Sequence, residues 1–399
     1  MATTKSDTLS YSRESLRERA SALVPRLRER AVATSAARQV PAETMADFWD
    51  AGLCYLLKPK KFGGPEVRVD HAFEIASVLS RGDGSAAWVW TVMGVHDLFL
   101  ALFPEKAQAE YWAKDRTLSA SSFAPGGKIT PAEGGCRLSG KWSFCSGVDH
   151  ASWMILGGIA GMLSTNPPIP DIRFMLLPMA DCKVIDDWHV LGLRGTGSKT
   201  VVVEDVFVPE HRSVKNEDLV SGRAPGADVN PGPLYRAPVW AIFPFCISSA
   251  APGIALGAVE SFITEMKARA AAFDHSPLAK RPNIQMRLSE ASALADAAEL
   301  LYRRSLTETI DTIMSGGTLS IEHRVRSRRD QGYSVQMAKR SAEILLGAEG
   351  GGGLYERGHV QRAMRDLHAL SGHLVANWDM PALNYGQVML GGPPADPFF

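Results

Sequence analysis

The chain has 399 residues, of which 45% are hydrophobic and 22% are charged, a composition typical of a soluble globular protein. Its 43 basic and 43 acidic side chains give a net charge of zero, which argues against a role on nucleic acid or a membrane surface and leaves little repulsion against self-association. This length exceeds what one hydrophobic core usually holds, so two or three domains are expected.

The cysteines and the chain start bear on the cellular compartment. The five cysteines include no C-x-x-C pair, and Met1–Ser10 has no secretory signal pattern. Reduced thiols and a cytoplasmic location are therefore predicted. The uncharged run Ala237–Val259 is long enough to span a bilayer, but three prolines interrupt it, so we expect buried helix and loop.

The amino-terminal part of the chain has helical patterns. Apolar residues recur at helical spacing in Arg13–Arg30, a second helix is predicted at Pro41–Trp49, and a further helical stretch covers Val69–Leu79. Ala86–Phe103 is almost entirely apolar, which is typical of a core helix. A histidine in such a helix, here His96, is more often a satisfied core residue than a functional one. We predict an N-terminal α-helical domain over residues 1–116.

The pattern changes near Thr117. Short alternating or β-branched segments bounded by Gly, Pro and Asn predict a middle β-domain over residues 117–225. Long helical patterns return after a Pro/Gly-rich linker at Arg223–Pro233 and predict a C-terminal α-helical domain over residues 226–399. The expected fold class is therefore α+β. The C-terminal helical patterns cover Gly253–Ala268, Ile284–Met314 and Ile321–Leu346.

A glycine-rich corner leads into a strand in Trp188–Pro209. Its three glycines allow positive φ and close backbone approach, and the valines that follow favour a strand. The glycines precede a strand instead of opening a helix, so this is no dinucleotide-binding fingerprint. A tight hairpin is the simplest structural alternative. The polar side chains that could contact an anion or a planar heterocycle are Arg194, Thr196 and Ser198.

The corner's pattern, G-x-R-G-T-G-S followed by V-x-V-E-D-V-F-V-P, resembles the middle β-domain of the acyl-CoA dehydrogenase superfamily, where this segment lies beside the flavin. Further on, Gly350–Leu354 and Arg365-Asp366 match the superfamily's G-G-x-G-[FLY] to R-D spacing. The resemblance covers most of the chain and agrees with the helical, β, helical order. It implies a bound flavin, with these cofactor-binding candidates: Arg194, Thr196, Ser198, Gly350 and Gly351.

The residues after Arg365 decide between two branches of that superfamily. In acyl-CoA dehydrogenases a glutamate nine residues after this arginine commonly serves as the base, and the position here is Leu374, which cannot accept a proton. The chain instead resembles the oxygenase branch, the two-component flavin-dependent monooxygenases such as the oxygenases of p-hydroxyphenylacetate and secosteroid phenol hydroxylation. There the histidine of R-D-x-x-A-x-x-x-H faces the substrate. His373 matches that spacing, and His368, on another helix face, is the alternative.

Two further segments resemble the same branch. Trp142–His150 is similar to its W-x-F-x-S-G-x-D-H motif, which implies that Ser146 lies beside the flavin N5. Ser119–Gly127 is similar to its S-S-x-x-P-x-G loop, which makes Ser121 a substrate-binding candidate.

Three single positions complete the candidates. Gly94-Val95-His96 resembles a G-V-H motif that places a histidine near the substrate, so His96 becomes a candidate for catalysis and substrate binding. Trp88 and Arg269 fall near positions that family members use for flavin ring packing and phosphate pairing. Aromatic residues that could line a pocket for an aromatic guest are Trp88, Trp90, Phe243 and Phe245.

The resemblance implies the oxygenase component of a two-component system. Reduced FMN or FAD from a separate flavin reductase would react with O₂ to give a C4a-hydroperoxide, protected in a dry pocket with N5 held by Ser146. His373 would take the proton of a small phenol-like substrate, because an imidazole titrates near working pH.

Three other functions stay open from the sequence. They are an N-, S- or indole-oxidising monooxygenase of the same branch, an acyl-CoA dehydrogenase, and a flavin-free helical scaffold. No metal site and no NAD(P)H site are identified in this chain. A homo-oligomer, dimer or tetramer, is expected, because long amphipathic C-terminal helices would otherwise expose apolar stripes.

Overall fold

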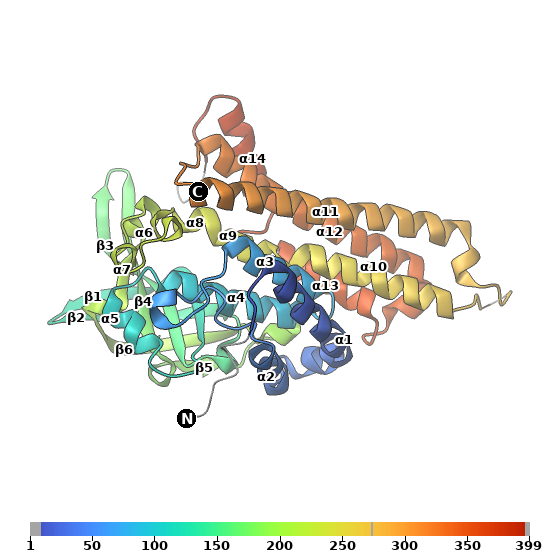
Figure 1. Cartoon of the computed structure of the whole chain (residues 1–399), viewed down its shortest axis with the longest axis horizontal. Helices are drawn as coiled ribbons and strands as arrows, with labels where there is room; N and C mark the ends of the chain where they lie inside the picture. The colour runs from blue at the N-terminus through green and yellow to red at the C-terminus, as the bar shows by residue number, and fades with distance from the viewer. Residues whose placement is uncertain (1–8, 273, 396–399) are drawn as a thin grey trace.

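A computed structural model of the chain describes residues 9–272 and 274–395. Helices from the two ends of the chain pack together, and the β-region formed by the middle of the sequence lies at one end of the molecule (Figure 1). Most of the amino-terminal stretch that lacks a signal pattern lies outside the described residues, as do the outer ends of the first and third predicted domains. The α+β prediction is confirmed.

Of the N-terminal helices, α3 (Val69–Ser80) and α4 (Gly84–Leu100) are the most deeply buried. Asp83 starts α4 by accepting a hydrogen bond from the Ser85 backbone N–H at 2.9 Å, an ordinary N-cap. The helix that follows is buried on all sides, as its apolar sequence predicts. The five N-terminal helices are α1 (Arg13–Ala37), α2 (Ala42–Asp50), α3 (Val69–Ser80), α4 (Gly84–Leu100) and α5 (Glu105–Tyr111).

The β-region is one seven-stranded sheet in the order β5-β6-β2-β1-β3-β4-β7. Among the strands of the described residues, only β1 and β3 pair in parallel, and the other neighbours are antiparallel. The strands are β1 (Ser119–Ala132), β2 (Gly135–Cys145), β3 (Trp153–Thr165), β4 (Pro168–Pro178), β5 (Lys183–Ile185), β6 (Lys199–Pro209) and β7 (Ser213–Lys215).

Trp142 is the largest side chain of the sheet's own core. It is buried, and its indole N–H donates to the Gly157 carbonyl at 2.8 Å, which joins β2 to β3. A Cβ built on Gly127 would lie 2.4 Å from the Trp142 ring, so the neighbouring strand needs a glycine there.

The C-terminal part is helical again. Its elements are α6 (Asn216–Ser221), α7 (Gly226–Val229), α8 (Val239–Ile242), α9 (Pro244–Ser248), α10 (Ala250–Ala268), α11 (Pro282–Met314), α12 (Ile321–Glu349), α13 (His359–Ser371) and α14 (Asp379–Met389). Within it Val239–Ala268 is apolar enough to cross a membrane, but 94% of its most apolar window is buried inside the fold. The expectation of buried helix in this region is confirmed.

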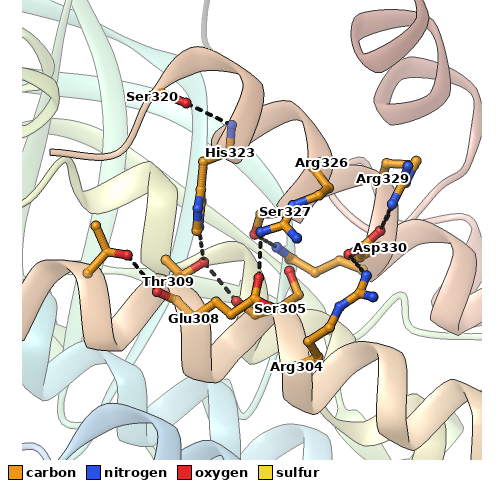
Figure 2. Close-up of polar contacts among 12 residues, drawn as sticks. Arg304, Ser305, Glu308, Thr309, Ser320, His323, Arg326, Ser327, Arg329 and Asp330 are labelled. Atoms are coloured by element: carbon orange, nitrogen blue, oxygen red, sulfur yellow. Dashed lines mark hydrogen bonds and ion pairs between the residues drawn. The ribbon is translucent and has the colours of Figure 1, made fainter. Parts of the chain in front are cut away.

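A polar seam joins the two long antiparallel helices α11 and α12 (Figure 2). The fully buried carboxylate of Asp330 accepts from Arg304 at 2.8 Å and from Arg329 on its own helix. Further along the same two helices, the hydroxyl oxygen of Thr309 lies 3.0 Å from Nε2 of His323. A buried carboxylate without such partners would be costly, so these contacts fix how α12 lies against α11.

Trp142→Ala tests the core of the sheet. We expect it to lower the free energy of unfolding by about 3–5 kcal/mol, because it removes a buried indole and leaves the Gly157 carbonyl without this donor. Urea denaturation followed by circular dichroism measures the change. Met162→Ala, at a half-exposed position on β3, is the control and should change stability by about 0.5 kcal/mol or less. Equal effects of the two substitutions would contradict this account of the core.

Candidate active site

Helix α4 carries two of the predicted residues, Trp88 and His96, and both are buried. They are eight residues apart, close to two helical turns, so they lie near the same face and roughly 12 Å apart along the axis. This helix therefore contributes to two polar clusters. We call the cluster around Trp88 the first pole and the cluster around His96 the second pole.

The first pole is a line of hydroxyl groups that begins at Trp88. The indole N–H donates to the Ser146 hydroxyl at 3.1 Å, and Ser146 is 2.7 Å from Ser198. Ser198 is 2.7 Å from the Thr196 hydroxyl, which donates to the Leu193 carbonyl at 2.8 Å. The structure thus brings four of the predicted cofactor-binding residues into direct contact.

The glycine-rich corner is fastened to α13. The Leu193 backbone N–H donates to the buried Asp366 carboxylate at 2.6 Å, and Arg365 donates to the Leu191 carbonyl at 3.0 Å. Burial raises the pKa of Asp366 to about 7, although the Leu193 N–H opposes this shift. Gly192 allows the contact, since a Cβ there would be 2.0 Å from the Arg365 carbonyl oxygen. The Arg-Asp motif is therefore what places Thr196 and Ser198.

His373 follows the C-terminal end of the same helix, and its ring packs edge-on against Trp88 with the centroids 5.7 Å apart. Burial, and then the charge of Arg328, lower the pKa of His373 to about 4, so the ring is neutral at physiological pH. The Val375 backbone N–H donates to Nδ1 at 3.3 Å. The neutral ring therefore carries its proton on Nε2, which favours a hydrogen-bond donor over the expected proton acceptor.

The alternative histidine has a different environment. His368 forms an ion-pair contact at 3.0 Å with Glu343 on α12. Leu374, which occupies the position of the dehydrogenases' base, is 75% exposed. Of these residues, His373 is the one in contact with Trp88.

The second pole is the pair His96 and Ser121. The Nδ1 of His96 lies 2.8 Å from the Ser119 carbonyl, so it must carry the proton, and Nε2 then accepts from the Ser121 hydroxyl at 2.8 Å. Burial lowers the pKa of His96 to about 4, and the bond to the Ser119 carbonyl acts in the opposite direction. His96 is thus a neutral imidazole with an accepting nitrogen.

Aromatic rings from four elements lie next to this pair. Phe123 is 6.1 Å from the His96 ring, 4.7 Å from Phe99 and 4.8 Å from Phe243, centroid to centroid. The ring cluster consists of Phe99 on α4, Phe123 on β1, Phe174 on β4, and Trp240 and Phe243, which lie in or next to α8. Sequence reasoning named Phe243 alone among these, because no periodic pattern links positions on separate elements.

Two aromatic candidates lie elsewhere. The Trp90 indole donates to the Leu53 carbonyl at 3.2 Å, away from the face that carries Trp88 and His96. Phe245 packs against Tyr302 of α11. Both side chains are buried and pack within the helical core.

The remaining candidates lie around the glycine-rich turn after α12. Arg269 donates to the Glu349 carbonyl at 3.3 Å, and its guanidinium lies next to Gly352. Arg194 forms an ion-pair contact with Glu356 at 3.6 Å. A Cβ on Gly350 or Gly351 would meet no atom within 4 Å, so this turn faces open space. Two arginines beside an open turn fit a phosphate-bearing ligand.

The side chains of the first pole match the contacts that a flavin ring needs. A flavin ring needs an apolar contact for its plane and polar groups for its nitrogen edge. The first pole supplies both, since Trp88 lies beside the buried hydroxyls of Ser146, Thr196 and Ser198. The roles of the individual residues stay predictions.

Comparisons with known proteins agree with this geometry. Residues 245–378 match the family model for the acyl-CoA dehydrogenase C-terminal domain. The crystal structure of 3-HSA hydroxylase from Rhodococcus sp. RHA1 superimposes with a TM-score of 0.90 at 34% identity, covering 96% of this chain and 99% of that one. The fold is therefore that of the acyl-CoA dehydrogenase-like flavoproteins.

Sequence relatives narrow the class. The chain is 37% identical over 372 residues to the oxygenase component of FADH₂-dependent resorcinol hydroxylase from Rhizobium sp., covering 90% of both chains. It is 35% identical over 381 residues to the flavin-dependent monooxygenase oxygenase subunit HsaA from Rhodococcus jostii, covering 95% of this chain and 99% of that one. The chain belongs to the flavin-dependent monooxygenases, as an oxygenase component, and the predicted family and enzyme class are confirmed.

The ionisation of His96 gives a direct test of the second pole. We expect its ring to be neutral at about pH 6 with the proton on Nδ1, because burial lowers its pKa. Histidine-selective ¹⁵N NMR reads both properties, and the His96→Asn variant identifies the signal. The unfolded chain takes up this proton below about pH 6.5, whereas the folded chain takes it up near pH 4, so this group disfavours folding increasingly as pH falls through that window. A ring that titrates near its ordinary pKa would contradict the assignment.

Proposed function

We propose that this oxygenase hydroxylates a small phenol-like aromatic substrate with reduced flavin supplied by a separate flavin reductase. The observation that carries the proposal is the buried pair His96–Ser121, with its accepting nitrogen, next to a cluster of aromatic rings. Relatives named for resorcinol hydroxylation and p-hydroxyphenylacetate 3-hydroxylation support a phenol as substrate.

The pair can remove a proton from a hydroxyl group. Ser121 donates its own proton to His96 Nε2, so its oxygen is free to accept a hydrogen bond from a substrate hydroxyl. A proton can pass from the substrate oxygen to Ser121 while the serine proton passes to Nε2. The imidazolium is then paired with the phenolate, and the Ser119 carbonyl accepts from Nδ1. A phenolate ring is electron-rich at the adjacent carbon, where an electrophilic oxygen adds.

The first pole holds the cofactor, reduced FMN or FAD. When bound, reduced flavin with O₂ supplies the oxygen atom that is transferred. Trp88 would pack against the flavin ring and Ser146 would contact the N5 edge, while Ser198 contacts Ser146 and Thr196 contacts Ser198. Arg194, Arg269 and the turn at Gly350 and Gly351 face the phosphate end. His373 offers its Nε2–H between cofactor and substrate.

The proposal also covers the oligomeric state of the protein and its cellular location. The chain forms a homo-oligomer, dimer or tetramer, because exposed apolar side chains on its C-terminal helices need cover. They include Met286 and Leu300 on α11 and Leu383 and Met389 on α14. All five cysteines are free, which suits the reducing cytoplasm proposed as its location. Analytical ultracentrifugation tests the oligomeric state.

A labelled-oxygen experiment tests the proposed function. The protein is combined with a flavin reductase, NADH, FMN or FAD, and ¹⁸O₂, and resorcinol is the first phenol offered. Mass spectrometry should find one ¹⁸O atom in a product with an added hydroxyl group. Product formation from indoles or thioethers but from no phenol would overturn the phenol assignment in favour of the other oxygenase chemistries. Bleaching of oxidised flavin by an acyl-CoA thioester would point to dehydrogenation.

Ser121→Ala and His96→Asn test the proton path. Each should lower the hydroxylation rate about 100-fold, the usual contribution of a positioned acid or base, and leave the affinity for reduced flavin unchanged. Reduced flavin should then be oxidised with little product. Ser122→Ala is the matched control, since the Ser122 hydroxyl contacts the Ser143 carbonyl instead of His96. Full product yield in either test variant would exclude the pair as the proton acceptor.

His373→Ala examines the other histidine. We expect it to bind reduced flavin and to lose most hydroxylation, because it removes the ring that packs against Trp88 and with it the proposed Nε2–H donor. Product yield per reduced flavin is the measurement. His368→Ala, which alters the Glu343 contact instead, serves as the comparison. Normal product formation by His373→Ala would remove His373 from the mechanism.

A further inference from the structure

The hydroxyl groups of the first pole form one hydrogen-bond chain whose two ends are fixed by chemistry. The indole N–H of Trp88 can only donate, and the carbonyl of Leu193 can only accept. Between these ends lie Ser146, Ser198 and Thr196, with successive distances of 3.1, 2.7, 2.7 and 2.8 Å. All five residues are at most 7% exposed.

Each proton in the chain follows from these ends. Thr196 donates to the Leu193 carbonyl, so its oxygen must accept from Ser198. Ser198 has then used its only proton, so it must accept from Ser146. Ser146 gives its proton to Ser198 and accepts the indole N–H from Trp88. This order needs no observed hydrogen positions, because a hydroxyl has one proton.

This order of hydrogen bonds limits the further hydrogen bonds that the Ser146 hydroxyl can form. Its proton is committed to Ser198, and one lone pair receives the Trp88 N–H, so one lone pair is unused. Any polar group brought next to this oxygen has to be a hydrogen-bond donor. The N5 position of a flavin is an N–H donor in the reduced ring and a bare accepting nitrogen in the oxidised ring.

We propose that Ser198 and Thr196 make Ser146 an obligate acceptor, so that the site selects reduced over oxidised flavin at N5. They are positioning residues, since they act on the cofactor through Ser146. The inference rests on the proposed function for the location of Ser146 beside N5. An oxidised ring must either break the bond between Ser146 and Ser198 or leave N5 unpaired, a loss of affinity of about 5-fold to 100-fold.

This selection suits an enzyme that takes its cofactor from another protein. Ser146 would accept the N5–H of reduced flavin supplied by the reductase, and it would hold oxidised flavin less tightly because that ring has no donor at N5. The difference in affinity between reduced and oxidised flavin thus comes from the direction in which three hydroxyl groups donate their hydrogen bonds. The protein alone sets this direction.

Anaerobic titrations of the full chain test the proposal. FMN and FAD, each oxidised or photoreduced, are titrated into the wild type, Ser198→Ala and Thr196→Val, and the ratio of the two dissociation constants is measured for each flavin. The wild type should bind the reduced form at least about fivefold more tightly. Ser198→Ala frees the Ser146 proton to face N5, so the ratio should fall about fivefold or more through tighter binding of oxidised flavin. Thr196→Val, which lets the chain reverse, should lower the ratio in the same direction.

Two controls separate this effect from a general loss of structure. Ser198→Thr keeps a hydroxyl and should keep the ratio. Ser152→Ala removes a hydroxyl that contacts the Leu118 carbonyl at 3.3 Å, outside this chain of hydroxyls, and should also leave it unchanged. The ratio of dissociation constants can be measured in every variant without catalytic turnover.

The outcomes distinguish the inference from the function on which it rests. A wild type that prefers reduced flavin, with the same preference in Ser198→Ala and Thr196→Val, overturns the inference alone. Equal weakening of both redox forms in these variants also overturns it, because it shows a purely structural role. A wild type that binds both forms equally overturns it as well. A wild type that binds no reduced flavin overturns the inference and the proposed function together.

Discussion

The arrangement of this molecule depends on the hydrogen bond from the Leu193 backbone N–H to the buried carboxylate of Asp366. It joins the corner of the sheet to α13, two parts of the chain separated by more than 170 residues. A carboxylate inside a protein is stable only with such partners, so the contact cannot slip without a large penalty. Because α13 ends just before His373, the same bond sets where the hydroxyls of Thr196 and Ser198 lie relative to that ring.

Helix α4 supplies the second constraint. It is buried on all sides and therefore rigid, and it holds Trp88 and His96 about two turns apart near one face. The residues proposed for cofactor contact and for proton transfer thus lie on one helix instead of on two loops. The distance between Trp88 and His96 along the helix also places the imidazoles of His373 and His96 in different surroundings. His373 belongs to the pole of Trp88, with its proton on Nε2, and His96 belongs to the pole of Ser121, with its proton on Nδ1.

Sequence patterns predicted the helices and the sheet well, because long apolar periodicities such as those of α4 and α11 leave few alternatives. Family motifs then brought Ser146, Thr196 and Ser198 to attention, and they do lie in contact. The motifs did not contain the direction of the hydrogen bonds, which depends on Trp88, a residue from a different element. Nor did they contain the aromatic cluster, whose members come from separate strands and helices. Composition alone also does not show which way a buried ring points, and the rings of Trp90 and Phe245 pack within the helical core.

The two hydrophobic cores differ in how much of the chain each needs. The sheet's own core is built entirely within residues 120–208, whereas the helical core combines residues from Leu16 to Ala376. During synthesis every residue of the sheet's own core has been made once β6 is complete, whereas α3 and α4 can contact α10, and α4 can contact α13, only much later. Until then the nascent chain exposes apolar side chains of α3 and α4, a state that favours aggregation and chaperone binding.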